Sequence, residues 1–295
     1  MIAFRRRHCL AITLCLPLFA FAATAEEKFG PQGKPDGDWR EQVWLIPLPH
    51  DGDRAMFTTV LRPPGEDKKP LVVINHGSPP KAEDRPNQRS VFKTASEWFV
   101  KRGYVVALPL RRGYGKTGGS WAETYGRCDG PDYRRAGLEG AKDIGAAIAY
   151  MTKQTFVRPE RVLVVGQSAG GWGSLTLSSL NPPAVAAVVD FAGGRGGYAD
   201  GKPNNNCAPD RLVEAAGEYG KTARVPTLWV FTENDLFFNP SLSRRMAEAY
   251  KGAGGKAEYN LLKPFGKDGH NLFGAGDGIG RWREIVAKFL DANGL

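Results

Sequence analysis

The 295-residue sequence predicts an α/β protein in which an antiparallel pair of strands precedes a mostly parallel sheet. From residue 71 onward, short apolar runs alternate with segments of helical periodicity, as in a parallel sheet that is buried on both faces. Before them, two strand-like runs at 42–48 and 55–62 flank His50-Asp51-Gly52-Asp53, which is typical of a hairpin turn. The composition, 42% hydrophobic and 24% charged, is that of a globular chain and excludes disorder.

The elements follow in order along the chain. Residues 26–38 are polar and rich in Gly and Pro, which predicts a loose N-terminal segment. The hairpin and about six parallel strands make a sheet of eight. We expect the parallel strands at 71–75, 104–110, 162–165, 184–191, 227–231 and 257–262, and the helices at 90–102, 134–153, 169–180, 241–251 and 281–290.

Two stretches, 111–131 and 192–224, do not fit this alternation. Both follow strands at the expected carboxyl edge of the sheet, where open α/β sheets bind their ligands, and we interpret them as insertions. No linker interrupts residues 26–295, which predicts a single domain.

Residues 1–25 have the three-part pattern of a secretory signal peptide: three arginines (Arg5, Arg6, Arg7), an apolar run over 9–22, and Ala23-Thr24-Ala25. The run is too short to cross a bilayer core of about 30 Å, so we expect export to the periplasm or beyond without a stable membrane anchor. Removing three arginines lowers the Lys and Arg count from 40 to 37, and 37 − 31 acidic residues leaves +6. Because no basic block carries this charge, we expect no nucleic-acid partner.

Four cysteines are present, and Cys9 and Cys15 belong to the predicted signal peptide. The remaining two, Cys128 and Cys207, would meet an oxidising compartment after export, and we expect them to form a disulfide. Two buried free thiols are the alternative.

The strongest local motif is Gly166-Gln167-Ser168-Ala169-Gly170, between an apolar run and a helical segment. This context is that of a nucleophile elbow, a tight strand-to-helix turn that exposes a serine above the helix N-terminus. A nucleophilic serine needs a base, and in this chain order the acid and then the histidine follow it. His270 is the only histidine after Ser168, so we expect it to be the base.

The acid is less clearly specified. Asp235 follows the strand at 227–231 and could orient His270, whereas Asp190 and then Glu233 are the alternatives. The oxyanion hole requires two backbone N–H groups, which we expect from Ala169 and from the loop after the strand at 71–75. In that loop Pro79 and Pro80 have no N–H, so the donor is Gly77 or Ser78, and Ser78 is favoured.

Other residues of these loops have two interpretations. His76 fits a loop-bracing role better than catalysis, and Arg111 and Arg112 brace the loop or line a substrate pocket. The aromatic residues Trp121, Tyr125 and Trp172 belong to the site or to the core.

With these residues in place, the chain resembles the α/β-hydrolase superfamily from about residue 42 to 290. The motifs that carry the resemblance are His76-Gly77, Arg112-Gly113-Tyr114-Gly115, Gly166-Gln167-Ser168-Ala169-Gly170, Asp235 and Gly269-His270. Within the superfamily it looks most like the dienelactone-hydrolase-like and prolyl-oligopeptidase-like groups. The resemblance implies an eight-stranded α/β-hydrolase fold and a Ser-His-Asp hydrolase that forms an acyl-enzyme without metal or cofactor. True dienelactone hydrolases use cysteine where this chain has Ser168.

The function expected from these residues is an exported serine esterase that acts on small-molecule carboxylic esters. A serine peptidase or amidase of the same fold is the alternative, because the chemistry is the same. A non-catalytic binding protein is less favoured, because the residues of the triad are all present.

Overall fold

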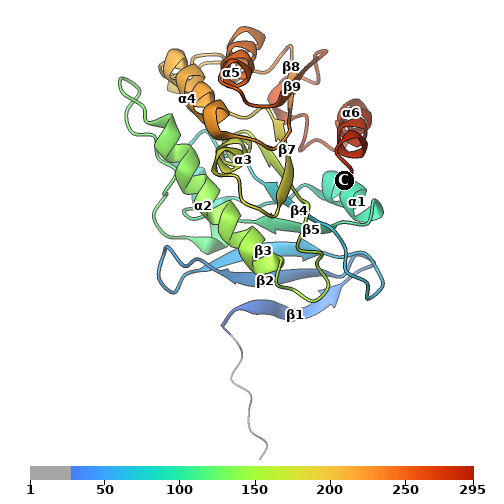
Figure 1. Cartoon of the computed structure of the whole chain (residues 1–295). Coiled ribbons are helices and arrows are strands. Elements are labelled where there is room, and N and C mark those ends of the chain that lie inside the picture. Colours follow the sequence, from blue (N-terminus) through green and yellow to red (C-terminus); the bar gives the residue numbers. More distant parts are fainter. Residues whose placement is uncertain (1–27) are drawn as a thin grey trace, which may run out of the picture.

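The computed structural model describes residues 28–295, and within them a single sheet of nine strands forms the centre of the molecule (Figure 1). The strand order is β1-β2-β3-β5-β4-β6-β7-β8-β9, with β4 to β9 parallel to one another and β1 to β3 antiparallel. The strands are β1 (Gly30–Asp36), β2 (Glu41–Pro47), β3 (Ala55–Leu61), β4 (Leu71–Asn75), β5 (Val105–Pro109), β6 (Val162–Gln167), β7 (Val185–Phe191), β8 (Thr227–Thr232) and β9 (Ala257–Leu262).

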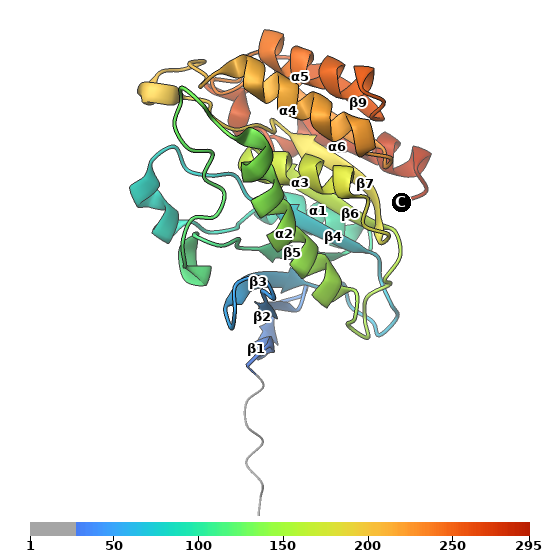
Figure 2. The ribbon, with the colours of Figure 1, turned by 60° about the vertical axis from the view of Figure 1, so that its left-hand side comes forward.

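Helices cover both faces of the sheet. Helices α1 (Lys93–Lys101) and α6 (Ile279–Ala292) lie on one face, and α2 (Tyr133–Met151), α3 (Ala169–Leu180), α4 (Pro209–Thr222) and α5 (Pro240–Gly252) lie on the other (Figures 1 and 2). Alternate residues of each parallel strand enter different hydrophobic clusters: in β4, Val73 packs toward α2 and α3, and Val72 packs toward α1 and α6. The uninterrupted apolar runs are therefore explained by burial on both faces.

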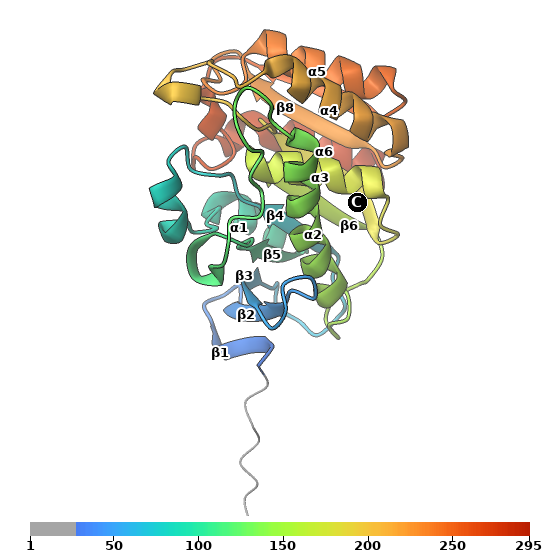
Figure 3. The ribbon, with the colours of Figure 1, turned by 90° about the vertical axis from the view of Figure 1, so that its left-hand side faces the viewer.

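The first strand corrects the prediction of eight strands and of a loose segment at 26–38. Strand β1 lies at the end of the sheet and pairs with β2, with Gly30 opposite Leu45 (Figure 3). Its sequence, GPQGKPD, has no alternation of apolar and polar residues. It is held by backbone pairing and by the Gln42 side chain, which donates to the Gly33 carbonyl at 2.7 Å. Proline is tolerated on such an edge strand, because one side of the strand needs no ladder hydrogen bonds.

Helix α4 corrects the expected insertion at 192–224, because residues 209–222 form a regular helix packed against α5. Proline at its first position and a buried stripe of Leu212, Ala215, Ala216 and Tyr219 stabilise it. The irregular part after β7 is thus shorter than expected. The predicted signal peptide, residues 1–25, lies outside the described residues. Among those described, no helix has the length and apolar character needed to cross a membrane.

The two irregular segments are joined by a disulfide between Cys128, after β5, and Cys207, after β7. The Cα atoms are 4.8 Å apart and the cysteines are 79 positions apart in sequence. The Cys207 backbone N–H also donates to the Gly196 carbonyl at 2.8 Å, and its carbonyl accepts a hydrogen bond from the Tyr133 hydroxyl. The disulfide therefore connects two loops that leave the same edge of the sheet.

Removal of this disulfide should destabilise the fold. A loop of this length gives a chain-entropy stabilisation of up to about 4–5 kcal/mol, so the Cys128→Ser/Cys207→Ser variant should unfold at clearly lower urea concentration than wild type. Peptide mapping after alkylation of denatured, unreduced protein provides the check. Alkylated Cys128 and Cys207 in wild type would contradict the pairing.

Candidate active site

Ser168 stands at the turn between β6 and α3, where the backbone is strained. Its φ of 55° and ψ of −121° lie in a region that non-glycine residues rarely adopt. Its backbone N–H donates to the Phe191 carbonyl at 2.9 Å, which fixes the turn against β7. The hydroxyl consequently stands at the carboxyl edge of the sheet, at the N-terminus of α3, where the helix dipole favours negative charge.

The glycines around Ser168 are required by close backbone contact. A Cβ added to Gly166 would lie 2.3 Å from the Gly170 carbonyl oxygen, and one added to Gly170 would lie 2.3 Å from the carbonyl oxygen of Asn75. Both distances are too short for any side chain. The G-x-S-x-G motif thus reflects a turn in which strand, helix and the neighbouring β4 backbone touch.

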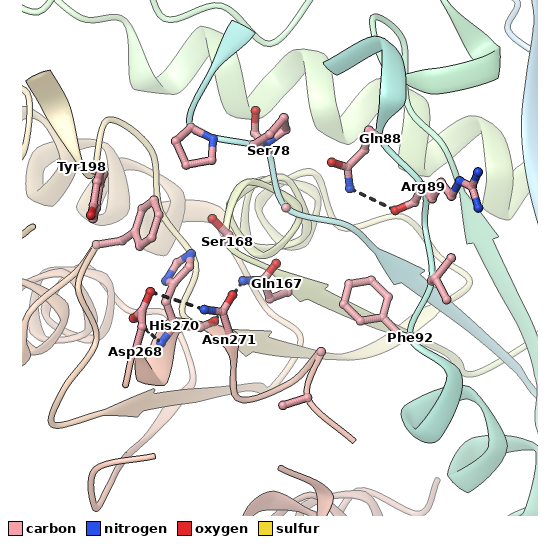
Figure 4. Close-up of a pocket in the computed structure, with 17 residues that line it drawn as sticks. Ser78, Gln88, Arg89, Phe92, Gln167, Ser168, Tyr198, Asp268, His270 and Asn271 are labelled. Carbon is pink, nitrogen blue, oxygen red and sulfur yellow. Dashed lines mark hydrogen bonds between the residues drawn. The ribbon is translucent and has the colours of Figure 1, made fainter. Parts of the chain in front are cut away.

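His270 is placed next to Ser168 by the short helix η4 (Gly269–Asn271). Its Nδ1 lies 3.2 and 3.1 Å from the two carboxylate oxygens of Asp235, so Nδ1–H donates and Nε2 faces away from the acid. Figure 4 shows the His270 ring turned toward the Ser168 hydroxyl. The ring also stacks on Phe237, with centroids 4.1 Å apart, and Gln167 donates to the His270 carbonyl at 3.1 Å. These contacts define the position and the tautomer of the imidazole.

Asp235 is buried and its charge is compensated. Its Oδ1 accepts hydrogen bonds from the backbone N–H groups of Phe237 at 2.7 Å and Phe238 at 2.9 Å. These donors and the imidazole Nδ1 hold the carboxylate in place. Asp235 can therefore orient His270 and stabilise a positive charge on it.

The two alternative acids lie elsewhere. Asp190 is fully buried, and no hydrogen bond of ordinary geometry reaches either carboxyl oxygen, although the Gly193 backbone lies against them. Burial raises the pKa of Asp190 well above its ordinary value, and the nearby Asp235 charge raises it further. Glu233 forms an ion pair with Lys263 at 3.1 Å, at the surface. The structure brings Asp235, and neither alternative, to His270.

The expected oxyanion-hole residues come from two separate segments that both lie beside Ser168. Ala169 is the first residue of α3, and Ser78 belongs to the loop that follows β4 and lines the same cavities as Ser168. The backbone of this loop touches the elbow, because a Cβ added to Gly77 would lie 2.5 Å from Gln167 Oε1 and 3.1 Å from Ser168 Cβ. An oxyanion formed at Ser168 would thus be close to both backbone segments.

His76 braces this loop. Its Nδ1 lies 2.7 Å from the Gly77 carbonyl oxygen, and its Nε2 accepts from the Arg111 backbone N–H at 3.2 Å. Burial, and secondarily the Arg111 charge, lower the pKa of His76 to about 3, so the ring is neutral at physiological pH. This arrangement agrees with the expected bracing role and leaves no ring nitrogen for catalysis.

A buried ionic cluster lies beside the elbow and centres on Glu123. The carboxylate is paired with Arg111 and with Arg195 Nη1 at 3.2 Å, and it accepts from the Tyr114 hydroxyl at 3.1 Å. Burial alone would raise the pKa of Glu123, but Arg111 and Arg195 lower it to about 2. Arg112 instead pairs with Asp143 and Glu139, so both predicted loop arginines make internal ion pairs. Trp172 belongs to the core, whereas Trp121 and Tyr125 line the site.

Two cavities meet at Ser168. The larger, of about 710 Å³, includes His270, Gln167, Phe92 and Tyr198 (Figure 4), and the smaller, of about 80 Å³, includes Ala169, Trp121, Arg85 and Arg195. Sequence reasoning missed Phe237, Arg85 and Arg195. The only signal was that Arg195 lies in the glycine-rich run Gly193-Gly194-Arg195-Gly196-Gly197, directly after β7. Within residues 28–295 no group of three His, Cys, Asp or Glu side chains could hold a metal ion.

Part of the chain is similar in sequence to known proteins. The model of the prolyl oligopeptidase family matches residues 90–193, a segment that contains Ser168. Dipeptidyl-peptidase 5 of Porphyromonas gingivalis is 28% identical over 141 residues, which cover 47% of this chain and 19% of that protein. The chain thus spans about a fifth of this curated relative.

Solved structures share the fold. The acylaminoacyl peptidase of Pyrococcus horikoshii aligns with this chain with a TM-score of 0.63 and 15% sequence identity. The alignment covers 87% of this chain and 42% of the peptidase chain. The Pyrococcus furiosus esterase Pf2001 superposes on 86% of this chain and 93% of its own, with a TM-score of 0.61 and 14% identity. These matches confirm the resemblance to prolyl-oligopeptidase-like proteins and show that the fold is that of the α/β-hydrolases.

The Glu123 cluster should make stability pH-dependent. In the folded protein the pKa of Glu123 is about 2, below its ordinary value of 4.5. The ionised Glu123 therefore contributes fully to the free energy of unfolding above about pH 5, and this contribution is lost as the pH falls toward 2. Glu123→Gln should therefore lower the free energy of unfolding by a few kcal/mol at pH 7 and by progressively less between pH 4.5 and 2. Urea titrations of both proteins across this range measure the difference, and a difference that does not change with pH would exclude this role.

Proposed function

We propose that the protein is a serine hydrolase of the peptidase type, which cleaves peptide or amide bonds through an acyl-enzyme. Ser168 is the nucleophile, His270 the general base and acid, and Asp235 the residue that orients His270. The observation that carries the proposal is a strained serine at a helix N-terminus beside the His270 imidazole, whose Nδ1 is bound by the buried carboxylate of Asp235.

The geometry suggests the following steps. Ser168 Oγ attacks the substrate carbonyl carbon while His270 Nε2 takes the hydroxyl proton, and the backbone N–H groups of Ala169 and Ser78 stabilise the oxyanion. His270 then donates that proton to the leaving amine, which leaves an ester between Ser168 and the acyl group. Water, deprotonated by the same imidazole, hydrolyses this ester and regenerates the serine.

The comparisons favour the peptidase alternative over the ester hydrolysis that was the main expectation from sequence. The matching family model is that of the prolyl oligopeptidases, and the curated relative is a dipeptidyl peptidase. Ester hydrolysis stays the second candidate, because the same triad cleaves esters and the fold is shared with an esterase. Small-molecule esters are accordingly a secondary class of substrate in this proposal, after peptides.

We also propose that the protein is exported. The Cys128–Cys207 disulfide supports this proposal, because disulfides persist in oxidising compartments. The signal peptide at residues 1–25 stays a prediction.

The nucleophile is tested by covalent labelling. A fluorophosphonate should label the wild-type protein and fail to label Ser168→Ala, whereas Ser241→Ala, which changes an exposed serine on α5, should be labelled like wild type. Ser168→Ala should also lose turnover by several orders of magnitude while it keeps the wild-type circular dichroism spectrum. Labelling of Ser168→Ala at the wild-type rate would refute the mechanism.

The same preparation decides between the two substrate classes. We expect hydrolysis of acylated aminoacyl anilides and of short peptides, measured as kcat/KM beside p-nitrophenyl esters of matched acyl groups. Ester turnover without any anilide or peptide cleavage would favour the esterase.

The assignment of the acid predicts opposite outcomes for two aspartates. Asp235→Asn should lower kcat by about 10³–10⁴-fold, because an amide stabilises the wrong imidazole tautomer and cannot stabilise imidazolium. Asp190→Asn is the matched control: burial raises the pKa of the Asp190 carboxyl, and this carboxyl makes no bond to His270, so its loss should cost far less. A large loss for Asp190→Asn beside a mild one for Asp235→Asn would reverse the assignment.

A further inference from the structure

The smaller cavity at Ser168, which we call the arginine cavity, is lined by two guanidinium groups. Arg85 comes from the short helix η1 (Ala82–Asn87), and Arg195 comes from the loop after β7. Both approach the ring of Trp121, with the guanidinium carbon 3.4 Å from its centroid for Arg85 and 5.3 Å for Arg195. Phe237 and Phe238 also line this cavity.

The positive charge around this cavity exceeds the negative charge. Arg111 and Arg195, both fully or nearly fully buried, share the one carboxylate of Glu123. The other carboxylate that acts on Arg111, Asp143, is already bound to Arg112 and His50. Arg112 also pairs with Glu139, so three cations (Arg111, Arg112 and Arg195) face three carboxylates (Glu123, Asp143 and Glu139). The excess of positive charge at the cavity therefore comes from Arg85, and a cation without a partner is costly to bury.

Arg85 has no ionic partner in the part of the chain that the structure describes. None of the ion pairs found within residues 28–295 includes it, and its Nε, like that of Arg195, is buried without a hydrogen-bond partner. Burial lowers the pKa of Arg85, and the charge of Arg195 lowers it as well. Guanidinium groups bind carboxylates through paired hydrogen bonds, so an incoming carboxylate would supply the missing acceptors.

The two cavities share Ser168 but differ in the other groups of the site that line them. His270, which protonates the leaving group, lines the larger cavity and is absent from the arginine cavity. Ala169, the expected oxyanion donor, lines the arginine cavity together with Ser168. The acyl part of the substrate therefore extends into the arginine cavity and the leaving group into the larger one. The disulfide at Cys207 and the Cys207–Gly196 hydrogen bond brace the arginine cavity, which Gly196 lines.

We propose that the arginine cavity selects substrates whose acyl group carries a second, negatively charged carboxylate: peptides cleaved after Asp or Glu. This inference rests on the proposed function, since it assigns the substrate class of the same site. Arg195 binds the carboxylate from the floor of the cavity and Arg85 from its rim over Trp121. The cavity volume of about 80 Å³ admits one side chain of the size of Asp or Glu and no acidic group larger than these.

The test compares acids with their neutral isosteres. Acetyl-Asp and acetyl-Glu aminocoumarin amides should be hydrolysed with kcat/KM at least ten times that of the Asn and Gln compounds. Two variants, Arg195→Gln and Arg85→Gln, should each reduce this ratio several-fold. In the first, Glu123 keeps its ion pair with Arg111, and the second breaks no ion pair. Arg89→Gln is the matched control, because Arg89 lines the larger cavity, and it should leave the acid-to-amide ratio unchanged.

A binding measurement separates the two proposals. Calorimetric titration of Ser168→Ala with acetyl-Glu-amide and acetyl-Gln-amide reports the cavity without any turnover, and the acid should bind at least ten times more tightly. Hydrolysis with equal kcat/KM and equal affinity for acid and amide would overturn the inference and leave the proposed function intact. Preferential binding of the acid without hydrolysis of any compound would support the cavity assignment and contradict the proposed function. Loss of the preference in Arg89→Gln as large as in Arg195→Gln would also overturn it.

Discussion

The backbone contact at the turn around Ser168 is the constraint on which the rest of the site depends. The turn places β6, α3 and the end of β4 so close that Gly166 and Gly170 admit no side chain. It also draws β7 near, because the Ser168 N–H is bound to the Phe191 carbonyl. Three neighbouring strands thus end around one hydroxyl, and every loop that leaves them begins beside it.

The same crowding separates the roles of two aspartates. Asp190 ends β7 and packs against Gly171 and Gly193, where a Cβ on either glycine would lie about 2 Å from its Oδ1. That space holds no donor in good geometry, and burial keeps the carboxyl protonated. Asp235 lies in the loop after β8, where the backbone N–H groups of Phe237 and Phe238 donate to its carboxylate. Local backbone geometry therefore decides which of the two acids makes hydrogen bonds to backbone N–H groups and to the histidine.

Different parts of the molecule supply the nucleophile and the lining of the arginine cavity. The sheet and α3 supply the nucleophile and its helix, whereas the loops after β5 and β7 supply Trp121, Glu123 and Arg195. The disulfide connects these two loops through Cys207, which packs in the hydrophobic core, and the buried ion pair between Glu123 and Arg195 connects them a second time.

The sequence by itself determined the elements whose information is local. The apolar runs of β4 to β9, the elbow around Ser168 and the single histidine after it follow from residue type and spacing, because burial and turn geometry impose these patterns directly. Strand β1 could not be predicted, since its Gly- and Pro-rich residues are held by backbone pairing with β2. Only the tertiary structure decided that Asp235 meets His270 and that Arg85 and Arg195 meet over Trp121, 110 positions apart in sequence. These contacts depend on how the loops after different strands approach one another in the folded protein. A contact between residues so far apart in sequence produces no periodic pattern from which it could be predicted.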